Sequence, residues 1–259
     1  LAGFRPDALS LQKGFDLFAM SSLTEGLGTV LLDAMALGQA IVATRAGGIP
    51  EVVAHDQTGV LVPPRDADAL AAIPDDRWLA QMARGIFQAG ISWQVVENKW
   101  AGIEEAFYNF DVGRVAMMSE DWFDELLDDP RIVRSPPKVQ AIQQNAVFIQ
   151  EVAAEAGSFG RKVGDWPAED FAGLLEWLKK NGSRLGGSTG AYTLRYLGKE
   201  SYVLSPSVIA RLEAEGVVDQ APTSKKAMQA VQEAFNTWKD QSGESLTVIS
   251  RVLAQSIDG

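Results

Sequence analysis

The sequence predicts a mainly α-helical protein whose helical domain is preceded by a partial α/β segment of the Rossmann type. Over residues 1–70, strand-like apolar runs alternate with helical patterns, which is typical of a parallel α/β layer. Over residues 71–259, apolar residues recur at intervals of three and four, as they do in amphipathic helices. The composition, 46% apolar and 22% charged in 259 residues, is that of a globular protein with a sizeable core.

The elements of the first segment follow in order. A short helix precedes a strand over residues 15–20, and residues 29–37 form an amphipathic helix that Gly38 ends. A buried strand over residues 40–44 leads through a Gly-Gly turn into a helix start. The run TGVLVPP is the last short strand, ended by its two prolines.

The helical part begins near a seam that we place between residues 69 and 73. Residues 66–72 suit a helix that follows the last strand of the first segment. Further helices are expected to end at Gly157, Gly182 and Gly216. Thr223 is predicted to cap a helix that runs to about Asp240, and LTVISRVLAQSI is the last amphipathic helix.

Composition excludes several kinds of chemistry. The chain has no cysteine and one histidine, His55, so we expect no disulfide, no metal site, no cysteine nucleophile and no cofactor. No apolar run approaches the roughly 18 residues of a membrane helix, and the N-terminus lacks the layout of a signal peptide. We therefore expect a cytoplasmic protein with no membrane partner.

The net charge of −11 opposes non-specific binding to nucleic acid, because such affinity comes mainly from Lys and Arg displacing counterions. Residues 1–70 carry 4 Lys and Arg against 8 Asp and Glu, and the remainder 19 against 26. Neither part is a basic domain, so a DNA-binding face would have to be a local patch.

The stretch over residues 84–100, RGIFQAGISWQVVENKW, combines small residues, an amide and aromatics. Gln88, Ala89 and Gly90 would let the backbone approach a partner closely, and Trp93, a buried-looking aromatic, offers a flat π-face. We interpret the stretch as a pocket wall. A helix corner whose tryptophans belong to the core explains the residue types equally well.

A second pattern is the glycine-rich run RLGGSTG over residues 184–190. Its glycines would allow a tight turn with bare N–H groups, and a helix that starts there adds its positive end. Such a turn could hold a DNA phosphate without much basic charge, although a plain turn between two helices is the alternative. The candidate phosphate-binding residues of the turn are Gly186, Gly187, Ser188 and Gly190.

Residues 1–70, with EGLGTVLLDAMALG and AIVATRAGGIPEVV, resemble the C-terminal, nucleotide-sugar-binding half of GT-B glycosyltransferases of the glycogen synthase-like group. That family's pair of acidic residues contacts the donor sugar and ribose, and corresponds here to Glu25 and Asp33. The resemblance implies a vestigial nucleotide-sugar site, because the acceptor domain of such enzymes has no counterpart here. Its diphosphate-facing residues would be Gly26, Leu27, Gly28 and Thr29.

From residue 73 onward, QAGISWQVVENKW, AFYNFDVGRVAMM and DPRIVRSPPKVQAIQQNAVF resemble the DNA-3-methyladenine glycosylase I family of the helix-hairpin-helix glycosylase superfamily. The resemblance implies that Trp93 stacks on an extruded base, that Gln88 reads its edge, and that damaged double-stranded DNA is the partner. The implied phosphate ligands are Arg134, Lys138, Arg184 and Lys225.

This sequence departs from the family at several positions. Gly85 stands where the family has a base-contacting glutamate, and the family's two-Cys, two-His zinc site cannot form here. Ser205 occupies the place of the aspartate that most of the superfamily carries. No lysine lies beside the hairpin, as a Schiff-base lyase would require, so the implied enzyme is monofunctional.

The leading hypothesis is a base-excision repair glycosylase that flips an alkylated purine of the 3-methyladenine type out of DNA and hydrolyses its N-glycosidic bond. Two alternatives remain: a fragment of a nucleotide-sugar-dependent glycosyltransferase, and a catalytically inactive DNA- or protein-binding module. The sequence does not indicate an oligomeric state, or whether the fusion is natural.

Overall fold

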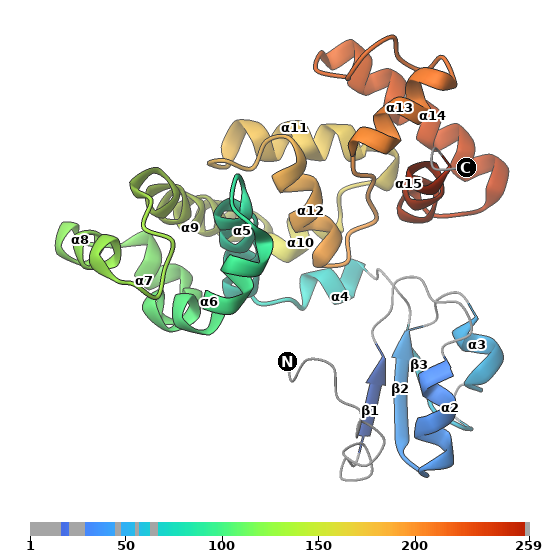
Figure 1. Cartoon of the computed structure of the whole chain (residues 1–259), viewed down its shortest axis with the longest axis horizontal. Helices are drawn as coiled ribbons and strands as arrows, with labels where there is room; N and C mark the ends of the chain where they lie inside the picture. Colours follow the sequence, from blue (N-terminus) through green and yellow to red (C-terminus); the bar gives the residue numbers. More distant parts are fainter. Residues whose placement is uncertain (1–16, 21–28, 45–47, 55–56, 63–66, 257–259) are drawn as a thin grey trace. The chain divides into compact units, whose positions relative to one another are not determined.

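A computed structural model describes residues 17–20, 29–44, 48–54, 57–62 and 67–256. The chain divides into two compact units, Leu1–Asp66 and Ala67–Gly259. The first unit holds all the described strands and the second is built from helices (Figure 1). The prediction of a mainly α-helical protein with a small α/β segment in front is therefore confirmed.

The first unit is a three-stranded parallel sheet in the order β1-β2-β3. Strands and helices alternate along the chain, as predicted, and Gly38 follows the first helix with φ of +68°. The expected helix before residue 15 lies outside the described residues. The elements are β1 (Leu17–Met20), α2 (Thr29–Ala36), β2 (Ala40–Thr44), α3 (Ile49–Val52) and β3 (Val60–Val62).

The two described helices of this unit share one small core. Ile41 and Ala43 of β2 are buried against Leu31 of α2 and Ile49 of α3. Both helices therefore cover the same face of β2, the arrangement that right-handed crossovers produce in a sheet of consecutive strands. On the opposite face of β2, Val42 is half-buried.

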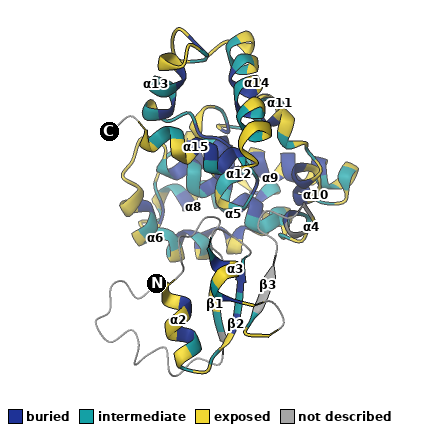
Figure 2. Cartoon of the chain, turned by 90° about the vertical axis from the view of Figure 1, so that its right-hand side faces the viewer, coloured by how far each residue is buried: buried dark blue, intermediate teal, exposed yellow. Residues whose placement is uncertain are grey.

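The second unit is helical throughout (Figure 1). Its elements are α4 (Ala67–Ala71), α5 (Asp75–Gln88), α6 (Trp93–Ala106), η1 (Tyr108–Phe110), α7 (Val112–Ala116), α8 (Glu120–Asp128), α9 (Pro136–Ala156), α10 (Phe159–Gly164), η2 (Ala168–Asp170), α11 (Phe171–Asn181), α12 (Ser188–Tyr196), α13 (Pro206–Ala214), α14 (Lys225–Ser242) and α15 (Leu246–Gln255). Helix α9 packs against α5, α7 and α10, and buried residues gather in the interior of the unit, around α5, α9, α10 and α12 (Figure 2).

Helix α4 belongs to this second unit, whereas the sequence pattern assigned residues 66–72 to the α/β segment. Leu70 is buried in the core of the helical unit, and α4 packs on α10. The approach is so close that a Cβ added to Gly160 would lie 2.2 Å from the Leu70 carbonyl oxygen. Helix α4 follows the strands in the chain, but its contact with α10 makes it part of the core of the helical unit.

The helix ends follow the expected residues except at the two ends of α14. Gly157 and Gly216 adopt positive φ after α9 and α13, where glycine is favoured because it has no Cβ. Ser224, rather than Thr223, caps α14 by accepting a hydrogen bond from the Ala227 amide. That helix ends at Ser242, two residues beyond the predicted end.

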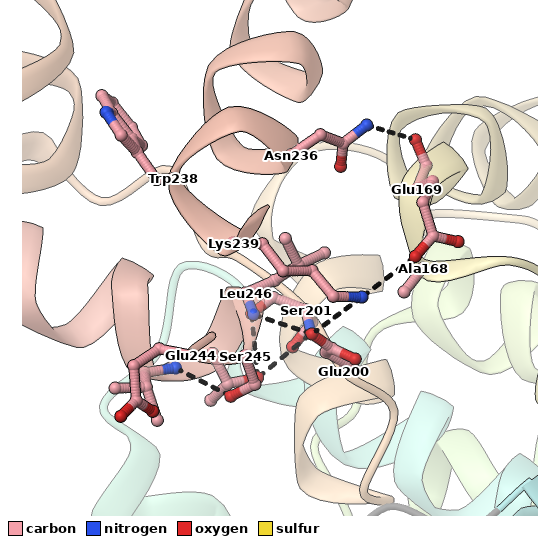
Figure 3. Close-up of polar contacts among 12 residues, drawn as sticks. Ala168, Glu169, Glu200, Ser201, Asn236, Trp238, Lys239, Glu244, Ser245 and Leu246 are labelled. Atoms are coloured by element: carbon pink, nitrogen blue, oxygen red, sulfur yellow. Dashed lines mark hydrogen bonds and ion pairs between the residues drawn. The ribbon is translucent and has the colours of Figure 1, made fainter. Parts of the chain in front are cut away.

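Lys239 links α14 to two segments that precede it in the chain (Figure 3). Its Nζ lies 3.0 Å from Glu169 Oε1 in η2 and 3.7 Å from Glu200 Oε1. The same Glu200 oxygen accepts a hydrogen bond from the Leu246 amide at the start of α15. These contacts fix the C-terminal helix pair to the segments that precede it.

Candidate functional site

The turn between α5 and α6 carries the predicted base-binding residues. Helix α5 ends at Gln88, Gly90 takes a positive φ of +76°, and Trp93 is the first residue of α6. The Trp93 side chain is 64% exposed, so the expectation of a buried aromatic is wrong. The buried residues of α6 are Val96, Ile103 and Ala106. Trp93 stands at the first helical position, before this buried stretch.

Polar side chains of α5 and α6 meet beside this turn. Gln88 Nε2 donates a hydrogen bond to Glu97 Oε1 over 3.1 Å, and Arg84 Nε lies 3.6 Å from the same oxygen. The Arg84 guanidinium also lies over the Trp100 ring, 4.1 Å from its centroid. The predicted base-reading amide of Gln88 is therefore held by a carboxylate that the sequence analysis did not single out.

Lys138 has a structural role that excludes it as a phosphate ligand in this arrangement. Its side chain is buried, and its Nζ donates to the carbonyl oxygens of Phe87 at 2.9 Å and Ala89 at 2.7 Å. Burial lowers the pKa of this ammonium group, and the nearby Arg184 charge lowers it further. Lys138 thus holds the C-terminal end of α5 instead of facing a backbone phosphate.

Asn145, seven residues after Lys138 on α9, holds the glycine-rich turn. It is fully buried, its Nδ2 donates to the Ser183 carbonyl at 2.9 Å, and its Oδ1 accepts from the Ser183 amide at 2.8 Å. Seven residues are about two helical turns, so Lys138 and Asn145 share one face of α9. This face joins the turn before Trp93 to the turn between α11 and α12.

The glycine-rich run forms a tight turn between α11 and α12, which both interpretations of the sequence predict. Arg184 and Gly187 have positive φ values of +58° and +59°, and a Cβ on Gly190 would lie 2.4 Å from the Leu185 carbonyl oxygen. No side chain caps the start of α12 at Gly187 and Ser188, which leaves its first N–H groups for a ligand.

The exposed basic candidates fall at different places around this turn. Arg184 is exposed and lies close enough to Lys138 to affect its pKa. Arg134 is exposed just before α9. Lys225, the first residue of α14, shares a cavity of about 680 Å³ with Gly187 and Ser188. Neither Trp93 nor Gln88 lines that cavity or the other one described, near α6 and α8.

Two positions where this sequence departs from the predicted glycosylase pattern have structural explanations. Ser205 caps α13 by accepting a hydrogen bond from the Val208 amide. A Cβ on Gly85 would lie 3.1 Å from Thr189 Cγ2, which is a tight contact between α5 and α12. Any side chain at position 85 would therefore require Thr189 to shift by a few tenths of an ångström.

Most of the predicted nucleotide-sugar site cannot be placed. Glu25, Gly26, Leu27 and Gly28 lie outside the described residues. Thr29 and Asp33 are exposed on α2, one helical turn apart. Their shared face does not by itself define a donor site.

Comparison with known proteins divides the chain in two. Residues 1–73 match the family model "Glycosyl transferases group 1", and residues 73–170 match "Methyladenine glycosylase". A GDP-mannose-dependent alpha-(1-6)-phosphatidylinositol monomannoside mannosyltransferase of Mycobacterium tuberculosis is 38% identical over 96 residues, 33% of this chain and 24% of that protein. An amylovoran biosynthesis glycosyltransferase of Erwinia amylovora is 40% identical over 81 residues, 28% of this chain and 20% of that protein. The chain thus spans about a quarter or less of these two relatives.

Two solved structures of 3-methyladenine DNA glycosylase I are also similar. One is 27% identical, with a TM-score of 0.42 over 48% of this chain and 79% of that one. The other, a variant from Staphylococcus aureus, is 26% identical, with a TM-score of 0.44 over 52% of this chain and 83% of that one.

The protein therefore joins segments of two enzyme classes, a glycosyltransferase and a DNA glycosylase. It consists of a glycosyltransferase group 1 segment followed, from residue 73, by a methyladenine glycosylase domain. The family model of that domain ends at residue 170, before the glycine-rich turn. None of the helices described here is long and apolar enough to cross a membrane.

Proposed function

We propose that the helical unit is a monofunctional DNA glycosylase that hydrolyses the N-glycosidic bond of an alkylated purine of the 3-methyladenine type. The observation that carries the proposal is the shared face of α9. Lys138 and Asn145 on that face hold the Trp93 turn and the glycine-rich turn to one helix. A base-stacking aromatic and a phosphate-binding turn must be fixed relative to each other if one extruded nucleotide is to reach both.

Each remaining candidate residue has a role in this proposal. Trp93 stacks on the extruded base, and Gln88 contacts its polar edge. The amides of Gly186, Gly187, Ser188 and Gly190, with Arg134 and Arg184, bind the DNA backbone on the side of α9. Lys225 lies across the turn, at the 680 Å³ cavity, and contacts a more distant phosphate.

Release of this base needs little catalytic assistance from the protein. An adenine alkylated at N3 carries a positive charge, so it leaves as a neutral base with the electron pair of the glycosidic bond. Water then adds to the sugar carbon and loses a proton to solvent. Because the leaving group is already activated, the reaction does not need the carboxylate that most of the superfamily has at this position. Ser205, whose hydroxyl caps α13, is therefore compatible with the reaction.

The direct test is base release from duplex DNA treated with a methylating agent. The intact protein should release 3-methyladenine, detected by mass spectrometry, at a rate proportional to its concentration. The Trp93→Ala variant should release roughly 5- to 150-fold less, since stacking contributes about 1–3 kcal/mol per base and each step of about 1.36 kcal/mol is tenfold in rate. DNA binding without any base release would instead identify a binding module, the alternative favoured by Ser205, which caps α13 where most of the superfamily has an aspartate.

A further inference from the structure

Helices α11 and α14 are joined near Gln232 and leave a cavity beyond that contact. Gln232 Oε1 accepts hydrogen bonds from the Ala172 amide at 2.8 Å and from the Tyr202 hydroxyl at 3.2 Å. From this contact α11 continues forward to Lys179 and α14 extends back to Lys225, and both stretches line one cavity of about 680 Å³. A cavity of this size between helices is in the range of small-molecule binding sites.

Much of the wall of this cavity is apolar. Leu175, Leu204 and Met228 pack against the core of the helical unit but are only half-buried, and all three line the cavity. The amide of Gln232, near the contact of the two helices, is already paired, because its Nε2 also donates to the Asn236 side chain at 2.9 Å. Burial of apolar surface is therefore the main attraction for a ligand in this part of the cavity.

Two lysines line the cavity away from the contact. Lys179 comes seven residues after Ala172, and Lys225 seven residues before Gln232, so each lies about 10 Å along its helix from the contact. Ser188, at the uncapped start of α12, lines the same cavity. The cavity thus combines an apolar wall with cationic groups and hydrogen-bond donors.

The charge of Lys225 is not compensated by the protein. Lys225 is the first residue of α14, whose first turn has no acidic residue, and a helix N-terminus disfavours a cation. Among the described residues, no carboxylate pairs with its ammonium group. The two acids that line the cavity are engaged, because Asp170 accepts a hydrogen bond from the Gly173 amide and Glu176 lies 3.8 Å from Lys179 Nζ. A negatively charged ligand would supply the missing partner.

We propose that this cavity is a binding site for a medium-chain organic carboxylate. The apolar chain lies on Leu175, Leu204 and Met228, and the carboxylate reaches the two lysines. The distance of about 10 Å between the helix contact and the lysines suits the length of such a chain. This site goes beyond the proposed function and does not depend on it, although Lys225 cannot serve the carboxylate and a DNA phosphate at the same time.

A titration of the intact protein with octanoate, followed by the NMR signals of the ligand, tests the proposal in the absence of DNA. Octanol, which has the same chain and no charge, is the matched probe. Octanoate should bind saturably at one site and about threefold to fivefold more tightly than octanol, as expected for an ion pair at an exposed position. Octanoate that does not saturate, or that binds no better than octanol, would overturn the proposal.

Lys225→Met removes the charge but keeps an unbranched side chain. It should weaken octanoate binding about threefold to fivefold and leave octanol binding unchanged. Lys226→Met is the matched control, because Lys226 is also exposed at the start of α14 but does not line the cavity. Equal weakening by the two variants would contradict the proposal, since it would mean that octanoate responds to the overall charge of the helix start.

Met228→Trp places a larger side chain at a half-buried position of the cavity wall. It should abolish binding of both probes, because the ring occupies the space of the chain. If this variant melts like the parent protein and binds octanoate equally well, the ligand lies elsewhere and the proposal is wrong. The Lys225→Met titration decides the question if Met228→Trp does not fold. Because no DNA is present, none of these outcomes depends on base release.

Discussion

The two units differ in how completely their apolar faces are covered. In the helical unit, α9 is packed by α5, α7 and α10, and Lys138 and Asn145 satisfy backbone groups of neighbouring segments. In the α/β unit, the described helices lie on one face of β2, and Val42 on the other face is only half-buried. Parallel sheets are normally covered on both faces. A recognisable family segment therefore need not contain a complete core.

This difference bears on function as well as on stability. A donor site in a parallel α/β fold lies in the crevice at the carboxyl ends of its strands, and usually draws on more than a three-stranded piece. The helical unit can position Trp93 and the glycine-rich turn with its own residues. The predictions below, in order of decreasing expected effect, test whether this contrast holds.

The largest effect should come from Leu70, the residue through which α4 completes the core of the helical unit. Leu70→Ala should lower the free energy of unfolding of that unit by about 2–4 kcal/mol, because it removes buried methyl groups and leaves a cavity. Urea denaturation followed by circular dichroism measures this. Met117→Ala, at an 85% exposed position, is the control and should change little.

Two fragments, with and without α4, test the same contribution to stability. A fragment of residues 67–259 should unfold cooperatively, whereas a fragment of residues 73–259 should lose about as much stability as Leu70→Ala. Equal stability of the two fragments would mean that α4 is dispensable and that the seam between the units lies after it.

Asn145→Ala should have the next largest effect, about 2–3 kcal/mol, because the part-buried Ser183 amide and carbonyl would both lose their partner. The loss should also loosen the glycine-rich turn and weaken DNA binding. Gln140→Ala, at an exposed position of the same helix, is the matched control. Weakened folding with unchanged DNA binding would show that this turn does not contact DNA.

Local sequence patterns predicted most of the secondary structure. Helices are indicated by the spacing of apolar residues and helix ends by glycine, and both signals involve only residues that are close in the chain. The helix ends at Gly157 and Gly216 are examples. The patterns failed where a distant partner decides. Lys138 has the residue type of a solvated phosphate ligand, but the carbonyls of Phe87 and Ala89 bury it.

The candidate site was predictable in the same uneven way. Trp93 and the glycine-rich turn stand out by residue type, and their roles stay predictions. Glu97 does not stand out, because a glutamate within an amphipathic helix usually faces solvent. Asn145, a polar residue within an otherwise apolar helical stripe, is the one signal in the sequence that could have revealed how α9 holds the turn.

A substitution at Trp93 can test function in the helical unit without a large change in stability. Because the side chain is 64% exposed, Trp93→Phe should change the free energy of unfolding by no more than about 0.5 kcal/mol, as surface substitutions usually do. It should nevertheless release 3-methyladenine more slowly, since the smaller ring offers less stacking area. Thermal melting and base release on one preparation decide this. A large loss of stability would show that Trp93 supports the fold, and normal release would remove it from the site.

A small effect on stability is expected at Lys239, and its pH dependence identifies its cause. Burial alone would lower the pKa of this ammonium group, but the hydrogen bond to Glu169 and the field of Glu200 raise it above 10.5. The pKa of Glu169 falls below its ordinary 4.5, through its own backbone amide first and Lys239 second. Lys239→Met should cost about 1 kcal/mol or less at neutral pH, because the Glu169 carboxylate is 63% exposed and solvent screens the pair.

The direction of both shifts sets the pH window of this effect. A carboxylate with a lowered pKa contributes stability above its unfolded value and loses it as the pH falls through the folded one. An ammonium with a raised pKa contributes below its unfolded value and loses it as the pH rises through the folded one. The difference between the parent protein and Lys239→Met should therefore be greatest between about pH 4.5 and 10.5 and shrink on either side. Lys226→Met, on the exposed start of α14, should show no such window, and a Lys239→Met difference that is constant with pH would mean that packing, not charge, holds α14 in place.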